Sequence, residues 1–317
     1  METKAVMRLV SFKIKADSQN TIGAFVNECY VDLHALTKGA LPDDMIAFLR
    51  MGSTGMSLAQ NALGAVKKNA ASTQAAIYAP DEIVLRAPVP RPGKIMHTAC
   101  NFDAHLDELT KWEQPEWQSH NWGDFHFEHP TGFLEAPSSV VASGAKVSPP
   151  HFTKQLDYEV EIAIIISKEA FRVKVDAAFD YVAGFTIFND LSARDIQARE
   201  HSNKVILLGK SFNGSCPFGP QLVTPDELSD PHNLNMKLLV NGEVRQDANT
   251  SQMHYKTAEL VSWWSNTTLE PGDIITSGSP PGVAAGMAVP NWLVPGDLVE
   301  ARIDELGTLV THIVEPN

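Results

Sequence analysis

The chain has 317 residues, 44% of them hydrophobic and 20% charged, and a formal net charge of −13 at pH 7. This is the composition of a soluble globular protein, long enough for one large domain or for a small domain and a large one. The negative charge argues against nucleic acid and anionic membrane surfaces as partners, and no apolar run approaches the roughly 20 residues that a membrane span requires.

The three cysteines, Cys29, Cys100 and Cys216, follow neither a metal-binding nor a disulfide spacing. Free thiols are typical of a reducing compartment, and the N-terminus shows no apolar region or cleavage site of a signal peptide. We therefore expect a cytoplasmic protein.

The first part of the chain reads as a small α/β unit without a cluster of reactive side chains, and a Pro-rich stretch at residues 87–93 follows it. We interpret residues 1–87 as a small N-terminal domain with a structural role and residues 94–317 as the catalytic domain. Within the N-terminal unit the pattern predicts strands at residues 7–13 and 23–31 and helices at residues 43–50 and 57–68.

A strand is expected at residues 94–99 and a short helix at residues 102–111. The next segment, residues 112–155, is irregular and rich in Trp, His, Pro and Gly. Segments of that length without regular structure inside a compact domain are commonly lids or binding loops. We expect this one to pack over a substrate pocket.

Two glutamates, Glu159 and Glu161, interrupt an otherwise apolar strand predicted over residues 156–166. Because side chains alternate along a strand, the two carboxylates share one face, with Cα atoms roughly 6.6 Å apart. Buried together, they repel each other and lose hydration unless a cation compensates them.

A third carboxylate, Asp190, follows the strand predicted at residues 181–188. Glu159, Glu161 and Asp190 can converge on one hard cation, Mg²⁺ or Mn²⁺, which would keep positions open for substrate oxygens. A solvated strand edge is the alternative reading, but the neighbouring positions are too apolar for it.

From residue 156 onward strands dominate. Asn241-Gly242 joins two strands in a hairpin signal, and a second hairpin closes the chain. A helix is expected between them at residues 253–267, followed by a strand at residues 274–276. Many strands with few helices favour an α+β fold with a mixed, rolled sheet rather than a doubly wound one. The hairpin strands are expected at residues 235–240, 244–247, 298–303 and 308–313.

Several ordered motifs of the last ~225 residues resemble the fumarylacetoacetate hydrolase family, in particular its branch of acylpyruvate hydrolases and 2-hydroxyhepta-2,4-diene-1,7-dioate isomerases. The resemblance implies a mixed β-roll, a Mg²⁺- or Mn²⁺-dependent site, a homodimer, and a small-molecule substrate that is a 2-oxo or diketo acid. The motifs are Asp157-Tyr158-Glu159-Val160-Glu161, residues 183–197, Gly209-Lys210-Ser211-Phe212, Pro217-Phe218-Gly219-Pro220, Val240-Asn241-Gly242-Glu243 and residues 269–275.

Carried over residue by residue, Glu159, Glu161 and Asp190 match the metal ligands of the family. The segment from Asn101 to Glu108 resembles its lid helix, in which His105 and Glu108 would form the dyad that activates water. The remaining matches line the pocket of the family. They are Arg194, Gln197, Lys210 and, for contact with a substrate carboxylate, Ser279.

The chain also departs from the family pattern at three places. Asn101 stands where some members have an aspartate as a fourth ligand, and Ser277-Gly278-Ser279-Pro280 replaces Thr-Gly-Thr-Pro. Glu135 stands where a lysine is common, so the pocket is expected to be more acidic than usual.

The resemblance implies a hydrolase that cleaves a C–C bond of an acylpyruvate or fumarylacetoacetate-like acid, through an enolate held by the metal. His105, oriented by Glu108, would deprotonate the attacking water, and Lys210 would stabilise oxyanion charge. An isomerase or decarboxylase of a 2-oxo or 2-hydroxymuconate-type acid in aromatic catabolism is the alternative. A non-catalytic scaffold and a glycosidase using Glu159 and Glu161 remain two further readings, and the glycosidase leaves Asp190 unexplained.

Overall fold

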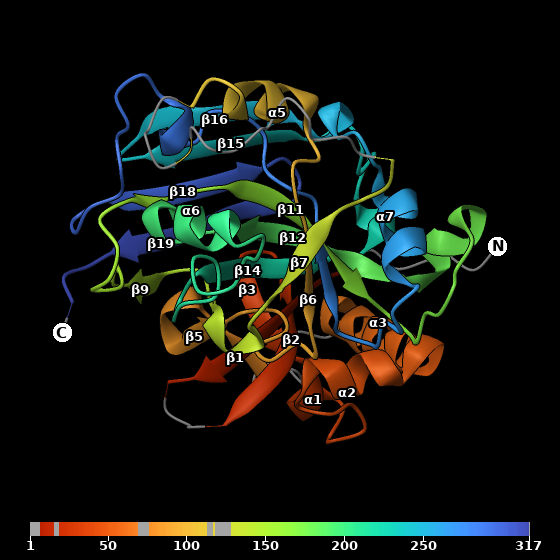
Figure 1. Cartoon of the computed structure of the whole chain (residues 1–317). Coiled ribbons are helices and arrows are strands. Elements are labelled where there is room, and N and C mark those ends of the chain that lie inside the picture. Colours follow the sequence, from red (N-terminus) through yellow and green to blue (C-terminus); the bar gives the residue numbers. More distant parts are fainter. Residues whose placement is uncertain (1–6, 16–18, 69–75, 113–116, 118–127, 317) are drawn as a thin grey trace.

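The computed structural model describes residues 7–15, 19–68, 76–112, 117 and 128–316. Strands outnumber helices, and the strands run both parallel and antiparallel to their neighbours, which confirms the predicted α+β class with a mixed sheet (Figure 1). No helix of the described residues is long and apolar enough to cross a membrane.

The largest sheet has twelve strands among the described residues, and its main path runs β4-β3-β2-β1-β14-β12-β11-β17-β6-β7. Strand β5 pairs with β1, and β8 pairs with β14. The strands are β1 (Arg8–Ile14), β2 (Asn20–Val26), β3 (Cys29–Asp32), β4 (Ile77–Tyr78), β5 (Ile83–Arg86), β6 (Ile95–Thr98), β7 (Gly132–Glu135), β8 (Val140–Val141), β11 (Val160–Ile166), β12 (Val182–Asn189), β14 (Cys216–Val223) and β17 (Ile274–Thr276).

A second sheet of five strands follows the order β16-β15-β18-β19-β9 and contains both predicted hairpins. The turn between β15 and β16 places Asn241 and Gly242 at positive φ, as a tight hairpin turn requires. A two-stranded ladder, β10-β13, completes the described sheets. Their strands are β9 (Ala145–Val147), β10 (Leu156–Asp157), β13 (Ser192–Ala193), β15 (Asn235–Val240), β16 (Glu243–Asn249), β18 (Leu298–Ile303) and β19 (Gly307–Ile313).

Except for the 17-residue helix at Gly52–Lys68, the described helices are short, and they lie outside the sheets (Figure 1). Asp32 and Asp44 accept hydrogen bonds from the first turns of α1 and α2, which explains where these two helices begin. The α-helices are α1 (Leu33–Leu36), α2 (Met45–Arg50), α3 (Gly52–Lys68), α5 (Asp103–Leu109), α6 (Arg194–Ser202) and α7 (Thr257–Trp264); the 3₁₀ helices are η2 (Pro80–Glu82), η4 (Pro137–Ser139), η5 (Val175–Tyr181), η6 (Pro225–Glu227), η7 (Thr250–Gln252) and η8 (Ala284–Gly286).

Four predicted elements differ in the structure. The helix predicted at residues 57–68 begins earlier, because α3 starts at Gly52. Residues 23–31 form two strands instead of one, because Asn27 and Glu28 adopt positive φ and reverse the chain. Residues 156–166 are also split, into β10 and β11, which belong to different sheets. The helix predicted at residues 253–267 is reduced to α7, whose start is fixed when the Lys256 amide donates to the Glu259 carboxylate.

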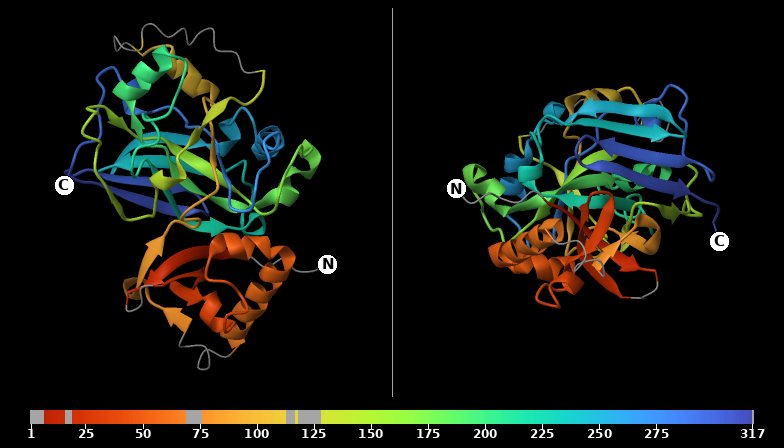
Figure 2. Two further views of the ribbon diagram at one scale, coloured as in Figure 1. Left: turned by 60° about the horizontal axis from the view of Figure 1, so that its bottom comes forward. Right: turned by 180° about the vertical axis from the view of Figure 1, so that it is seen from behind.

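The N-terminal unit packs beneath the larger part of the chain (Figure 2). Strand β1 pairs with β14 through Arg8↔Val223 and Leu9↔Leu222, so the sheet continues from one part into the other. The Pro-rich stretch between them is packed rather than loose, since Ala87 and Val89 are buried in the same apolar cluster as Leu9 and Leu222. The N-terminal unit and the rest of the chain therefore share one apolar core, and their division into two domains stays a prediction.

Candidate active site

One face of the large sheet carries the polar cluster. Along β11, Ala163 and Ile165 face the apolar cluster shared with the N-terminal unit, while their neighbours Ile162 and Ile164 face the other core. Glu161 lies two residues before Ala163 on β11, and His97 lies two residues after the buried Ile95 on β6, so each pair shares a face of its strand. Alternation along both strands therefore puts Glu161 and His97 on one face, next to the core.

Strand β17 connects these two positions. It pairs with β11 through Ala163↔Thr276 and with β6 through Ile275↔Met96. This register brings Thr276 beside His97, and the Thr276 hydroxyl lies 3.0 Å from Nδ1 of His97. The carboxyl end of β12 adds Asp190, whose amide donates to the carbonyl of Glu159 at 2.9 Å.

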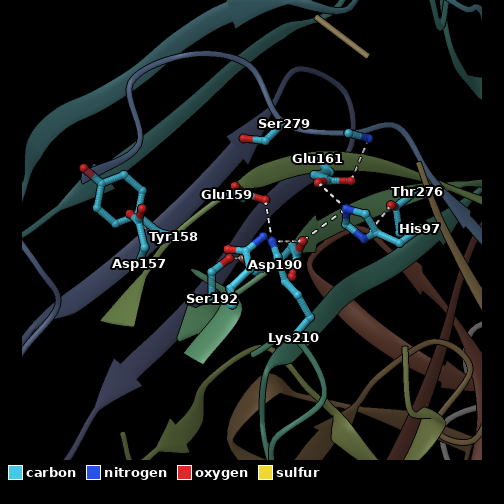
Figure 3. A network of polar contacts seen from close by, with 12 residues as sticks. His97, Asp157, Tyr158, Glu159, Glu161, Asp190, Ser192, Lys210, Thr276 and Ser279 are labelled. Atoms are coloured by element: carbon cyan, nitrogen blue, oxygen red, sulfur yellow. Dashed lines mark hydrogen bonds and ion pairs between the residues drawn. The ribbon is translucent and has the colours of Figure 1, made fainter. Parts of the chain in front are cut away.

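The predicted metal ligands converge (Figure 3). Glu159, Glu161 and Asp190, together with His97, each offer a ligand atom, and these four atoms lie within 4.8 Å of one another. Lys210 contacts Glu159 at 2.9 Å and also forms an ion pair with Asp190. All five side chains are buried.

The local charges do not balance. Ion-pair contacts join five buried carboxylates, and among the described residues two permanently charged cations, Lys210 and Arg194, lie between them. Burying an excess of negative charge is costly unless a further cation is present. The carboxylates are Glu135, Asp157, Glu159, Glu161 and Asp190.

The carboxyl pKa values reflect this imbalance. Burial tends to raise the pKa of Glu159, but Arg194 and Lys210 hold that pKa well below its ordinary value. Asp190 shifts in the opposite direction, because burial and the charge of Glu135 raise its pKa well above the ordinary value against the effect of Lys210. The protein's own cations thus neutralise one side of the cluster and leave the other side short of positive charge.

The histidine of the cluster responds to the same excess. Burial alone would lower the pKa of His97, but the carboxylates of Glu161, Asp190 and Glu135 raise it well above its ordinary value.

The cluster fits a divalent cation. Glu161 Oε1 and Asp190 Oδ1 are buried and have no hydrogen-bond partner among the residues that the structure describes. Three carboxylates and one imidazole form a donor set that divalent metals accept. The excess negative charge, the types of donor atom and the unsatisfied oxygens all favour a bound divalent cation.

His105 and Glu108, the predicted dyad, contact each other on α5. Nδ1 of His105 lies 2.8 Å from Oε2 of Glu108, one helical turn away. The other oxygen of Glu108 accepts from the amide of Gly282 at 2.9 Å, so the carboxylate is held from two sides. Because a carboxylate only accepts, Nδ1 carries the proton and Nε2 is left as a base.

Arg194 and Gln197 lie on α6 and contact each other, with Nη1 of Arg194 donating to Oε1 of Gln197 at 2.9 Å. The same guanidinium donates to Asp157 at 2.8 Å and to Glu159 at 2.5 Å. Asp157 also accepts from the amides of Ala284 and Ala285. Arg194 is therefore a buried cation that connects Glu159 with Asp157 and, through Asp157, with the start of η8.

These residues share one cavity of about 400 Å³, a volume that suits a small organic ligand. His97, Glu159 and Lys210 lie on its wall together with His105, Arg194, Gln197 and Ser279. Trp112 and Trp117, from the predicted lid, line it as well. Residues 113–116 and 118–127 of that lid lie outside the described part of the chain.

The structure shows what two of the residues that depart from the family pattern, Asn101 and Glu135, contact. The side chain of Asn101 is engaged with the backbone of Tyr255 through both its oxygen and its nitrogen, at 2.7 and 3.0 Å, and is not part of the ligand cluster. Glu135 lies behind His97, with Oε2 at 3.4 Å from Nδ1. Glu135 therefore faces His97, a residue of the cluster that the sequence analysis did not predict.

The only local signal for His97 is a polar side chain within a short buried strand.

The chain is similar to a known family and to several known proteins. The profile of the fumarylacetoacetate (FAA) hydrolase C-terminal family matches residues 94–314. The mitochondrial oxaloacetate tautomerase Fahd2a of Rattus norvegicus is 37% identical over 311 residues, which cover 97% of this chain and 92% of that protein.

Two solved structures are similar over nearly their whole length. The fumarylacetoacetate hydrolase of Exiguobacterium antarcticum is 28% identical, with a TM-score of 0.76, and the match covers 98% of this chain and 100% of that one. The maleylpyruvate hydrolase of Sphingobium sp. SYK-6, solved with manganese(II) and pyruvate, is 26% identical, with a TM-score of 0.73 and the same coverage. Since the profile spans more than half of the residues and one relative matches almost all of them, the chain belongs to the fumarylacetoacetate hydrolase family of enzymes.

Proposed function

We propose that this chain is a divalent-metal-dependent tautomerase that interconverts the keto and enol forms of oxaloacetate or a closely similar 2-oxo diacid. The observation that carries the proposal is a cavity whose wall includes Glu159 of the buried carboxylate cluster and His105, the histidine that Glu108 orients. The rat relative, an oxaloacetate tautomerase by name, supports the choice of reaction, and the manganese and pyruvate of the Sphingobium structure support the class of ligand.

Tautomerisation moves one proton from C3 of the acid and returns one to the oxygen on C2, so it needs a base but no nucleophilic water. Glu159, Glu161 and Asp190 would hold the cation. When bound, that cation neutralises negative charge on the 2-oxo and carboxylate oxygens of the substrate.

His105 would take the proton from C3 and deliver it to the oxygen on C2, and the reverse transfer would regenerate the keto form. Its Nδ1 is occupied by Glu108, which leaves Nε2 as the nitrogen that takes up and returns the proton. Glu108 also stabilises the imidazolium that forms, and the Gly282 amide keeps that carboxylate in place.

Lys210 and Arg194 would hold the carboxylates of the metal site in position through ion pairs. Lys210 bridges Glu159 and Asp190, and Arg194 bridges Glu159 and Asp157, so the two cations fix the geometry of the cluster. Gln197 and Ser279 lie on the cavity wall and would bind the substrate carboxylates.

Hydrolysis of a C–C bond in an acylpyruvate is the second candidate. The dyad favours it, because a base oriented by a carboxylate can also deprotonate water. The predicted hydrolase thus stays a prediction, now ranked after tautomerisation because of the rat relative.

An ultraviolet assay separates the reactions. Freshly dissolved oxaloacetate is followed through its enol absorbance with Mn²⁺, with Mg²⁺ and with EDTA, and pyruvate is measured at the end of each run. A tautomerase speeds the approach to the keto–enol equilibrium only with metal and forms no pyruvate. Pyruvate with CO₂ would instead identify a decarboxylase, and cleavage of an acylpyruvate into two acids would identify the hydrolase.

A pair of variants tests the ligands in the same assay. Glu161→Gln should lose both bound metal and catalysis, whereas Glu169→Gln, at an exposed position, should keep both. Full metal content and full activity in Glu161→Gln would contradict the proposed site.

A further inference from the structure

His97 belongs to the cluster by position, although the ligand set carried over from the family contains only carboxylates. Its Nε2 lies 3.1 Å from Oε1 of Glu161 and 3.1 Å from Oδ2 of Asp190 (Figure 3). We propose that His97 is a fourth protein ligand, bound through Nε2, and that it makes the site prefer a first-row transition metal over Mg²⁺. This inference rests on the metal-dependent function proposed above.

The separations match those of ligands that share one ion. Two ligand atoms at right angles around a cation, each roughly 2.1 Å from it, lie about 3.0 Å apart. The 3.1 Å contacts of Nε2 are close to that value. Oε1 of Glu161 has no hydrogen-bond partner among the described residues, so it too is available to the ion.

The other side of the ring is arranged as for a metal-bound histidine. Nδ1 faces Oε2 of Glu135 at 3.4 Å and the hydroxyl of Thr276 at 3.0 Å. A carboxylate on the far nitrogen commonly fixes the tautomer of a ligating imidazole and raises its basicity. Both oxygens of Glu135 are buried without a hydrogen-bond partner in the described structure, and Nδ1 of His97 lies beside one of them.

The ring plane is fixed as well. Strand β7 pairs with β6 so that Phe133 stands opposite His97, and the two rings stack with centroids 4.5 Å apart and planes at 17°. The register places Glu135 two residues further along β7, on the same face. The pairing of β6 with β7 thus brings His97 and Glu135 into contact, although 38 positions separate them in the sequence.

An imidazole ligand alters the choice of metal. Mg²⁺ prefers oxygen donors and binds nitrogen poorly, whereas Mn²⁺, Fe²⁺, Co²⁺ and Zn²⁺ accept imidazole. A site with three carboxylates and one nitrogen should therefore bind Mn²⁺ more tightly than Mg²⁺. The ratio of the two affinities should be larger than in the same site without the nitrogen.

Pulsed electron paramagnetic resonance on the full chain loaded with Mn²⁺ tests the bond itself. We expect ¹⁴N modulation from a directly bound imidazole in the wild type, and its loss in His97→Gln. The matched control is His105→Gln, which removes another histidine of the cavity wall and should keep the modulation. Bound Mn²⁺ without ¹⁴N modulation in the wild type would overturn the inference while leaving the proposed function intact; no Mn²⁺ binding at all would overturn both.

Calorimetric titration gives the second readout. His97→Gln should weaken Mn²⁺ binding at least about 10-fold and Mg²⁺ binding much less, and Glu135→Gln should weaken Mn²⁺ binding by about 10- to 100-fold while keeping the ¹⁴N signal. Equal losses for the two metals in His97→Gln would contradict the proposed selectivity.

Discussion

Arg194 is a buried guanidinium whose charge is matched by Asp157 and Glu159 at distances of 2.8 and 2.5 Å. Such a pair adds little net stability when both partners are present, because desolvation offsets the attraction. Removing one partner is different, since the remaining charge stays buried and unpaired.

Arg194→Met should therefore lower the free energy of unfolding by about 3–5 kcal/mol, as measured by urea denaturation. The control is Lys237→Met, which breaks the exposed pair with Asp247 and should cost less than about 1 kcal/mol. Equal costs for the two variants would contradict this structural role of Arg194.

The dyad gives a prediction for catalysis at the same scale. His105→Ala should lower turnover by about 10²- to 10⁴-fold, because it removes the base, and should leave the metal content unchanged. His254→Ala, which removes an exposed histidine paired with Asp103 at the start of the lid helix, serves as control. Unchanged turnover in His105→Ala would exclude the role of this base.

At the level of elements, the turn after β17 holds Glu161. Gly278 has a φ of +80°, and its amide donates to Oε2 of Glu161 at 2.8 Å. A Cβ at this position would lie 2.8 Å from the carbonyl oxygen of Thr98, so both the backbone angle and the space require glycine.

Gly278→Ala should lower both the unfolding free energy, by about 1–3 kcal/mol, and the affinity for Mn²⁺, because the turn must move away from Glu161. Gly64→Ala is the matched control, since no atom within 4 Å meets its Cβ in α3, and it should be neutral or stabilising by up to about 1 kcal/mol. Calorimetry and thermal melting measure the two effects. Unaltered Mn²⁺ affinity in Gly278→Ala would show that the turn does not position Glu161.

The start of α7 offers a pH-dependent element. The amide of Thr257 donates to Nε2 of His232 at 3.3 Å, which requires the neutral ring. Burial lowers the pKa of His232 below its ordinary value of 6.5, and Lys256 acts in the same direction. The unfolded chain therefore takes up this proton first, and the contribution to stability is present above about pH 6.5 and is lost as the pH falls.

Urea unfolding of the wild type and of His232→Gln at about pH 7.5 and about pH 5.5 measures this contribution. The stability advantage of the wild type should shrink at the lower pH, because glutamine does not titrate. An advantage that is the same at both pH values would contradict the assignment.

For the whole molecule, the shared core makes the N-terminal unit part of the catalytic fold. The apolar cluster contains Leu9 and Phe48 from that unit and Phe188, Phe218 and Leu222 from the remainder. Removing residues 1–87 would expose the apolar face of the large sheet and leave β14 without its partner β1.

A fragment of residues 94–317 should consequently aggregate or lose its cooperative melting transition, whereas the full chain should unfold in one step. Size-exclusion chromatography and far-ultraviolet circular dichroism report both properties. A monodisperse fragment with the melting temperature of the full chain would refute the role of the shared core. The expected homodimer and the cytoplasmic location remain predictions at this scale.

Sequence patterns were sufficient for features whose causes are local. Asn241-Gly242 predicts its hairpin because few other residues adopt two consecutive positive φ angles. The spacing of His105 and Glu108 predicts their contact because residues three apart share a helical face. The sequence likewise anticipated that Glu159 and Glu161 meet, although the predicted single strand is not the cause, because Glu159 lies between β10 and β11.

The lateral order of the strands was not readable from the sequence, and it decides the rest of the site. His97 reaches Glu161 only because β17 lies between β6 and β11, and Glu135 reaches His97 only because β7 pairs with β6. Such neighbours are chosen by which apolar faces fit together in the folded chain, a property that no short stretch of residues contains. The sequence by itself therefore determined the hairpins, the dyad and the three carboxylates of the cluster, and only the tertiary structure brought a histidine and a fourth acid to them.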